Sequence, residues 1–102
     1  MQSQKNKRFD AVKRANMGAL IKDLRKAAGL TQHDMAKLVG QDYFTMISQV
    51  ETGRVRVPPS DTKVWADTLG VDVQAFAKEC VRSYETDLYF LAIYGRDTSR
   101  GL

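Results

Sequence analysis

The fold is decided by the central stretch of the chain, residues 24–53, which reads LRKAAGLTQHDMAKLVGQDYFTMISQVETG. Apolar residues recur in it at steps of three and four, which is the spacing of one face of an α-helix. Gly29, Gly40 and Gly53 interrupt this pattern, and glycine commonly follows the end of a helix. The stretch therefore predicts the end of one helix followed by two short helices.

The two short helices have recognisable beginnings. Thr31 is a residue type that caps helix N-termini, so a helix is expected over residues 32–39. Asp42 is a similar cap candidate, and the second helix is expected over residues 42–52. The positions expected to face the core are Met35, Leu38, Val39, Phe44, Ile47 and Val50.

Helical spacing continues on both sides of this stretch. Further helices are expected over residues 17–28, 60–69, 72–84 and 88–94, with Asp72 and Asp87 as the N-cap candidates of the last two. The Pro58-Pro59 pair predicts a loop because proline cannot continue a helix. Since no segment alternates as a half-buried strand does, the fold class is expected to be all-α. The additional inward positions are Met17, Leu20, Ile21, Leu24, Ala28, Val64, Trp65, Leu69, Val73, Phe76, Ala77, Cys80 and Tyr84.

Length and composition indicate one globular domain. The chain has 102 residues, of which 43% are hydrophobic and 27% are charged. Its longest apolar run, residues 88–94, is far shorter than the roughly 18 residues that cross a bilayer, and no signal-peptide pattern opens the chain. We therefore expect a soluble, cytoplasmic protein with no membrane partner.

The sequence lacks the residue combinations of enzymes and of metal sites. One cysteine, Cys80, and one histidine, His33, exclude an internal disulfide and a structural zinc site. No activated nucleophile, carboxylate pair or phosphate-binding glycine loop stands out, so we expect no catalysis, no cofactor and no small-molecule ligand. Cys80 is expected to be buried and inert, and His33 to face solvent or a phosphate.

The positive charge is concentrated at the front of the chain. The net charge is +4, but residues 1–30 alone carry +6 whereas residues 61–102 carry −2. This asymmetry favours an anionic partner such as nucleic acid. Residues 1–16 are expected to form a basic arm that either contacts such a partner or stays a solvated tail. The candidate arm contacts are Lys5, Lys7 and Arg8.

A set of short motifs, in a fixed order, resembles the lambda-repressor-like family, also called the Cro/C1-type or XRE family. The motifs are Leu24-Arg25-Lys26-Ala27-Ala28-Gly29-Leu30-Thr31-Gln32, Met35-Ala36, Val39-Gly40, Ile47-Ser48-Gln49-Val50-Glu51-Thr52-Gly53, Trp65-Ala66 and Leu69-Gly70-Val71. The resemblance covers about residues 17–76. It implies a five-helix domain, residues 17–84, with a helix-turn-helix whose second short helix enters the major groove of double-stranded DNA.

The resemblance also implies which residues read the bases. Measured from the inward Ile47, the contacting positions of the family fall on residues early in the second short helix. Glutamine can pair with adenine, hydroxyl groups can reach bases or phosphates, and an aromatic ring can touch the thymine methyl group. The turn before this helix is one residue longer than is usual in the family, so the first contacting residue is not fixed to a single position. Tyr43, which precedes Phe44, is therefore included among the candidates. Phe44 also fits the apolar stripe that faces the core. The candidate base-reading residues are Tyr43, Phe44, Thr45, Ser48 and Gln49.

Other positions of the resemblance imply phosphate contacts and an internal ion pair. Gln32, at the start of the first short helix, and Arg54 and Arg56, in the loop after the second, match positions that touch DNA phosphates in the family. Arg25 and Glu51 match a partly buried salt bridge of the family. We therefore expect this pair to be structural and its loss to unfold the protein.

The last segment of the chain, residues 85–102, carries more apolar surface than a small helix can hide within one chain. We expect it to be a dimerisation segment that packs across a two-fold axis; the alternative is that it folds back over the same chain. The candidate interface residues are Leu88, Leu91, Ile93 and Tyr94.

Together these features predict a dimeric, sequence-specific transcriptional regulator of bacterial or phage type, associated with the nucleoid when bound to DNA. Occlusion of a promoter at a palindromic operator is the mechanism expected of a repressor without a ligand domain. An antitoxin, which would neutralise a toxin as its protein partner and repress its own operon, is the alternative. A third possibility is an accessory protein that binds a sigma factor or polymerase and activates transcription.

Overall fold

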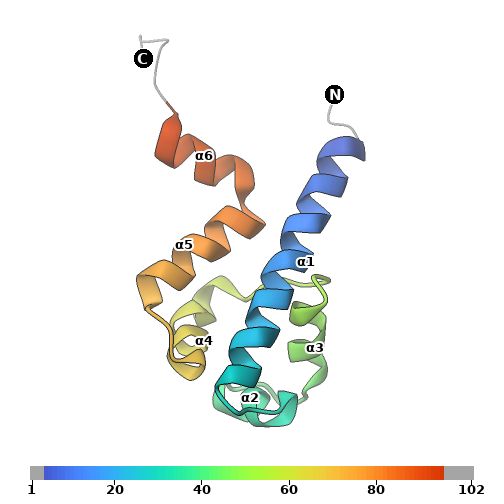
Figure 1. The fold of residues 1–102 in the computed structure, drawn as a ribbon, viewed down its shortest axis with the longest axis vertical. Helices are drawn as coiled ribbons and strands as arrows, with labels where there is room; N and C mark the ends of the chain where they lie inside the picture. The colour runs from blue at the N-terminus through green and yellow to red at the C-terminus, as the bar shows by residue number, and fades with distance from the viewer. Residues whose placement is uncertain (1–3, 96–102) are drawn as a thin grey trace.

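The computed structural model describes residues 4–95, and the side chains of residues 10–95. All regular secondary structure in this part of the chain is helical, which confirms the predicted all-α class. The helices are α1 (Gln4–Ala27), α2 (Gln32–Leu38), α3 (Thr45–Glu51), the short 3₁₀ helix η1 (Pro59–Asp61), α4 (Thr62–Leu69), α5 (Val73–Tyr84) and α6 (Thr86–Tyr94) (Figure 1).

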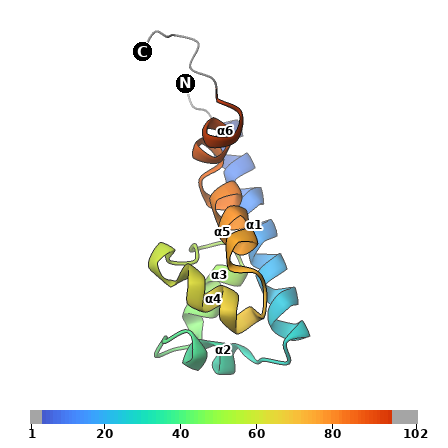
Figure 2. The same cartoon turned by 90° about the vertical axis from the view of Figure 1, so that its left-hand side faces the viewer.

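The molecule is elongated. Helices α2, α3 and α4 gather around the C-terminal half of α1, while the N-terminal half of α1 and the whole of α6 project from this cluster toward the same end (Figures 1 and 2). The radius of gyration is 15.4 Å, against about 13 Å for a compact domain of 100 residues. Part of the chain therefore lies outside the compact core.

The core fills the space between the C-terminal half of α1 and helices α2 to α5. Trp65 of α4 is fully buried at its centre. The other buried apolar residues are Met17, Ile21, Met35, Ala36, Val39, Ile47, Val50, Val57, Ala66, Leu69, Phe76 and Cys80. Burying a large apolar side chain stabilises a fold by about 1.5–3 kcal/mol, and burial raises the pKa of the Cys80 thiol to about 11. The expected burial of Trp65 and Cys80 is confirmed.

Helices α1 and α3 approach each other at backbone distance. A Cβ atom added to Gly18 of α1 would lie 2.3 Å from the carbonyl oxygen of Glu51 and 2.5 Å from that of Val50. One turn earlier on α1, a Cβ atom added to Gly53, which has a φ of +84°, would lie 2.9 Å from the backbone N and Cα of Ala15. These contacts hold the end of α3 firmly against α1.

Helix α1 is much longer than the sequence predicted. We expected it to begin at Met17, with a basic arm before it, but it begins at Gln4 and passes through residue 16 without a break. The segment has few apolar residues, so it lacks the periodic stripe used to recognise helices. It also contains no proline, and its neighbours in the helix are already packed, so each added residue extends the helix without a new nucleation step.

Two other helices start at different residues from those expected. Helix α4 begins at Thr62 because Pro59 starts the separate turn η1. Helix α6 begins at Thr86, with Glu85 at its N-cap position, so Asp87 lies in the first turn and is not the cap that we expected. By contrast, the predicted Asp72 cap of α5 is confirmed, since its carboxylate accepts the Ala75 N–H at 2.9 Å.

Some positions expected to face the core are exposed. The side chain of Leu38 is 55% exposed, because the short α2 packs on the core through Met35 and Ala36. Leu20, Val64 and Ala28 are also exposed. Within residues 4–95, no helix combines the length and the apolar character needed to cross a membrane.

Candidate functional site

Helix α2 is fixed at its first turn by a reciprocal pair of hydrogen bonds. The Asp34 N–H donates to the Thr31 hydroxyl oxygen at 2.9 Å, and the Thr31 N–H donates to the Asp34 carboxylate at 3.0 Å. This arrangement is a capping box, and the Thr31 N–H lowers the pKa of Asp34. The predicted Thr31 cap is therefore confirmed, and the orientation of Gln32, the first residue of α2, follows from it.

The turn between α2 and α3 differs from the expectation. Helix α3 begins at Thr45, with Phe44 at the N-cap position and no side-chain cap, so Asp42 does not start the helix. Residues 41–44 form the turn, and Tyr43 projects from it with 75% of its surface exposed. Phe44 lies outside the core, and its ring packs on that of His33 with 4.3 Å between the ring centroids. The prediction that Phe44 faces the core is therefore wrong.

Helix α3 has one buried face and one exposed polar face. Ile47 and Val50 are fully buried beneath it. Thr45 and Gln49, four residues apart, are both exposed and lie one turn from each other on the outer side. Ser48 is half-buried between the two faces. The outer face thus presents a hydroxyl and an amide on a rigid helix, and an amide can both donate and accept hydrogen bonds.

A buried ion pair connects α1, α2 and α3. Arg25 donates from Nε to Glu51 Oε2 at 2.6 Å and from Nη2 to Glu51 Oε1 at 3.2 Å. The same guanidinium donates from Nη1 to the Leu30 carbonyl oxygen at 2.7 Å. Gln32 donates from Nε2 to Glu51 Oε1 at 3.0 Å. The side chains of Arg25 and Glu51 are only 8% and 3% exposed, so the pair fixes the relative placement of the two short helices.

The loop after α3 folds back onto the end of that helix. The N–H groups of Arg54 and Val55 both donate to the Gln49 carbonyl oxygen, at 2.9 and 3.3 Å. The hydroxyl of Thr52 donates to the carbonyl oxygens of Ser48 and Gln49. Arg54 is exposed at this bend. Arg54 therefore lies beside the C-terminal end of α3 and is open to solvent.

Arg56 lies apart from Arg54. Its Nη1 donates to Glu85 Oε2 at 2.6 Å, and its Cζ lies 4.9 Å from the centroid of the Tyr84 ring. Nε of the same residue donates to the Val57 carbonyl oxygen at 3.2 Å. Arg56 therefore contacts the junction of α5 and α6, whereas Arg54 lies at the bend that follows α3.

Helix α6 offers a second exposed surface. The four candidate interface residues, Leu88, Leu91, Ile93 and Tyr94, are all more than half exposed. Phe90 is exposed as well, and its ring stacks on that of Tyr94. The candidate arm contacts Lys5, Lys7 and Arg8 belong to α1, but their side chains lie outside the described ones.

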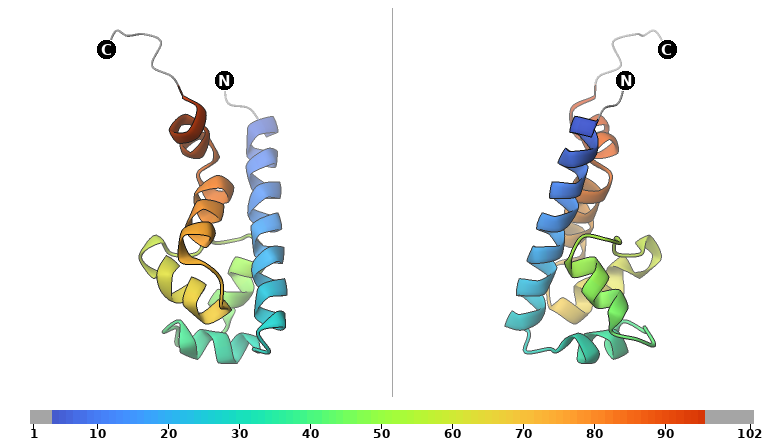
Figure 3. Two further views of the ribbon diagram at one scale, coloured as in Figure 1. Left: turned by 60° about the vertical axis from the view of Figure 1, so that its left-hand side comes forward. Right: turned by 90° about the vertical axis from the view of Figure 1, so that its right-hand side faces the viewer.

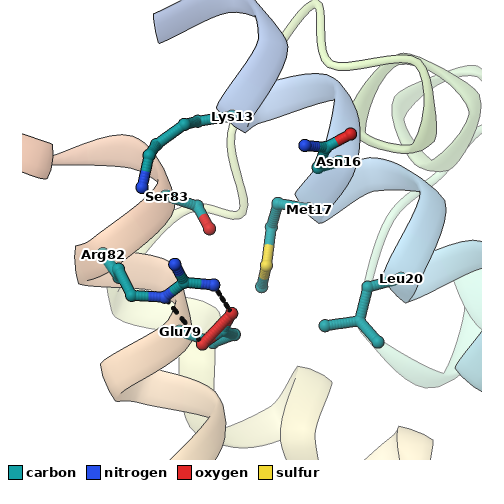
Figure 4. Close-up of a pocket in the computed structure, with 7 residues that line it drawn as sticks. All are labelled: Lys13, Asn16, Met17, Leu20, Glu79, Arg82 and Ser83. Carbon is teal, nitrogen blue, oxygen red and sulfur yellow. Dashed lines mark hydrogen bonds and ion pairs between the residues drawn. The ribbon is translucent and has the colours of Figure 1, made fainter. Parts of the chain in front are cut away.

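A hollow of about 240 Å³ lies between α1 and α5. Figure 4 shows Arg82 and Glu79 bonded to each other at its edge, and the hydrogen bond from Arg82 lowers the pKa of Glu79. In Figure 1, α5 and α3 lie on opposite sides of α1, so this hollow is not part of the polar face of α3. The residues around it are Lys13, Asn16, Met17, Leu20, Glu79, Arg82 and Ser83.

Sequence reasoning missed two contributors to the site. Gly18 was not singled out, although a glycine inside a helical pattern often marks a close approach of backbones. His33 is exposed, as was expected, but its ring also packs on that of Phe44, and this contact was not foreseen. No local pattern predicts that contact, because His33 lies in the first turn of α2 whereas Phe44 lies in the turn that precedes α3.

The part of the chain around this site matches a known protein family. A family model described as a helix-turn-helix domain matches residues 16–78, more than half of the chain. The match covers the C-terminal half of α1, all of α2, α3 and α4, and the first half of α5, and α6 lies beyond it. No curated protein matches the chain.

Proposed function

Because the chain belongs to the helix-turn-helix domain family, we propose that it is a sequence-specific transcriptional regulator that reads double-stranded DNA with α3. The observation that carries this proposal is the outer face of α3. It presents Thr45 and Gln49 to solvent, and the Arg25–Glu51 pair holds it in place against α1. A polar helix face of this kind, fixed on its domain, can enter the major groove and read base edges.

The chemistry of the exposed side chains suggests a division of roles. Gln49 can make two hydrogen bonds to adenine, and the hydroxyls of Thr45 and Ser48 can reach a base or a phosphate. Tyr43 and Phe44, which precede α3, offer apolar rings to a thymine methyl group. These five residues form the proposed base-reading set.

Phosphate contacts would come from the edges of this face. Arg54 supplies an exposed positive charge beside the C-terminal end of α3. Gln32, bonded to Glu51 through one of its amide hydrogens, keeps its carbonyl oxygen and a second hydrogen for other partners. Such contacts position a protein on the duplex and make its affinity depend on salt.

We further propose that the protein acts as a homodimeric repressor of the Cro/C1 type, with α6 at the dimer interface. A helix that is apolar on all sides is normally buried, whereas α6 exposes most of its large apolar side chains. A second copy of the chain would cover them and would place two recognition helices about 34 Å apart on a palindromic operator. Occupation of such an operator would block a promoter.

Replacing Gln49 by alanine should weaken binding to the preferred sequence by about 1–3 kcal/mol and leave binding to unrelated DNA unchanged, because one base contact is lost. Replacing Arg54 by glutamine should weaken binding to the preferred sequence and to unrelated DNA alike. It should also reduce the slope of log affinity against log salt concentration by about 1. Fluorescence anisotropy with duplexes selected from random DNA measures all three quantities. Gln74→Ala on α5 is the matched control, and equal affinities for wild type, Q49A and R54Q would refute the proposed DNA-binding surface.

Replacing Leu91 by aspartate should convert the dimer to a folded monomer, because a charge would then have to be buried in the interface. Analytical ultracentrifugation gives the mass and circular dichroism the helix content. Leu38→Asp is the matched control, since Leu38 is similarly exposed but lies on α2. A dimer that persists in L91D at all concentrations would exclude α6 as the interface.

A further inference from the structure

We propose that Arg56 is a positioning residue: it ties the loop after α3 to the joint between α5 and α6, and thereby sets the spacing of the two recognition helices. This inference rests on the proposed function, since spacing has meaning only in a dimer that reads two half-sites. It gives Arg56 a role different from the phosphate contact that the sequence suggested.

The joint between α5 and α6 consists of one residue. Glu85 is the single non-helical residue between Tyr84 and Thr86, with φ −128° and ψ 57°. Its N–H donates to the Val81 carbonyl oxygen and its own carbonyl oxygen accepts the Tyr89 N–H, both at 2.8 Å. The direction of α6, which leads away from the helix-turn-helix region in Figure 3, therefore depends on two backbone angles.

Arg56 holds this joint from the loop after α3. It reaches the Glu85 carboxylate at 2.6 Å and lies over the Tyr84 ring, so it contacts both the last residue of α5 and the joint itself. On the loop side, the neighbouring Val57 is fully buried in the core. Burial also raises the pKa of Tyr84 to about 12, in keeping with a ring that is packed under the loop. The Arg56 contacts thus connect the fixed end of α3 to the base of α6.

A small rotation at Glu85 moves the far end of α6 by several ångströms. The 9 residues of α6 form a helix about 13 Å long, so a rotation of about 20° at its base moves its far end by about 5 Å. This movement exceeds the rise of one base pair, about 3.4 Å per step. A dimer joined through α6 would carry that shift directly into the distance between its two copies of α3.

The ion pair is partly exposed, with side chains that are 33% and 43% accessible. Exposed ion pairs contribute little to the free energy of unfolding. Loss of Arg56 should therefore change the direction of α6 and leave the core intact, which separates a positioning role from a general structural one.

Half-site spacing tests this directly. The unchanged protein first enriches its preferred half-site from a random duplex pool, and two copies of that half-site are then placed at separations that increase by one base pair. In Arg56→Gln and in Glu85→Gln, we expect the preference for the best separation over its neighbours to fall about three- to fivefold. Affinity for a single half-site and the salt slope should stay at their wild-type values.

Arg54→Gln is the matched comparison, because it should lower the salt slope and keep the spacing preference. If R56Q lowers the salt slope as R54Q does and keeps the spacing preference, Arg56 contacts phosphate and the proposal is overturned. The charge-exchanged double variant, Arg56→Glu with Glu85→Arg, should recover most of the spacing preference that either single change removes. A double variant no better than R56E would equally contradict an Arg56–Glu85 tie.

Hydrogen exchange provides a readout that needs no DNA. In R56Q the amides of residues 86–94 should exchange about threefold faster or more, while those of α3 and α4 keep their protection. Unchanged exchange in α6 would overturn the proposal. If the wild-type protein enriches no sequence, the proposed function fails. In that case hydrogen exchange in α6, by itself, tests whether Arg56 holds the joint between α5 and α6.

Discussion

Replacing Glu51 by alanine should reduce the free energy of unfolding by about 3–5 kcal/mol, because it leaves the charge of Arg25 buried without a partner. The guanidinium of Arg25 would keep its bond to the Leu30 carbonyl oxygen but lose both contacts to the carboxylate. Gln32 would lose its acceptor as well. Since small domains are stable by about 5–15 kcal/mol, much of the fold's stability depends on this one side chain.

Urea denaturation followed by circular dichroism measures this loss. The matched control removes both partners: Arg25→Met with Glu51→Met should be far more stable than E51A, because it leaves no unpaired charge and keeps the volume filled. A single variant E51A as stable as the wild type would show that the ion pair is not a structural support. If the double variant were less stable than E51A, the cause of the loss would lie elsewhere than in the unpaired charge.

Replacing Gly18 by alanine should destabilise the protein by about 3 kcal/mol, because the added Cβ would overlap backbone atoms that cannot rotate away. The overlap falls on the carbonyl oxygens of Val50 and Glu51, so α1 and α3 would have to separate. Intrinsic helix propensity predicts the opposite sign, since alanine is favoured over glycine inside a helix by about 1 kcal/mol. The direction of the change therefore distinguishes packing from propensity.

Gly40→Ala is the comparison for this prediction. Gly40 has a φ of +81°, and a Cβ atom added there would meet open space, so alanine should cost about 1–2 kcal/mol from backbone strain alone. Thermal unfolding of the two variants should rank G18A as the less stable. The reverse order, or a G18A variant more stable than the wild type, would show that α1 and α3 can move apart freely.

Periodic patterns predicted the helices well because the core itself is periodic. Ile47 and Val50 recur at a helical step and are both buried, and Trp65 lies at the centre of the structure as its apolar neighbours suggested. The N-terminal half of α1 is the helical segment that apolar periodicity did not predict. It is helical because the helix continues from a packed segment, and its own residues carry little apolar signal.

The first residue of α3 could not be predicted from the sequence. Asp42 is a favourable cap by residue type, but the chain needs residues 41–44 to turn, and Phe44 is held there by the ring of His33. Such contacts between segments have no local signature. The exposed positions of Thr45 and Gln49 followed from spacing alone, because they lie opposite buried residues on the same helix.

The contacts of the two arginines in the loop after α3 likewise have no local signature in the sequence. Arg54 and Arg56 are alike in the sequence and were given the same role. The structure separates them, because the partner of Arg56 is Glu85, which lies 29 positions further along the chain. Long-range partners are set by the packing of α5 against α1 and α4, which no pattern within the loop contains.

The burial of Trp65 has a practical consequence for studying this protein. It is the single tryptophan of the chain, and it is enclosed by the core, away from the outer face of α3 and from α6. Indole emission moves to longer wavelength when the ring enters water, so unfolding has a built-in optical signal, whereas contacts made on the outer surfaces leave the ring undisturbed. Stability and ligand binding can thus be followed separately, without attaching a dye.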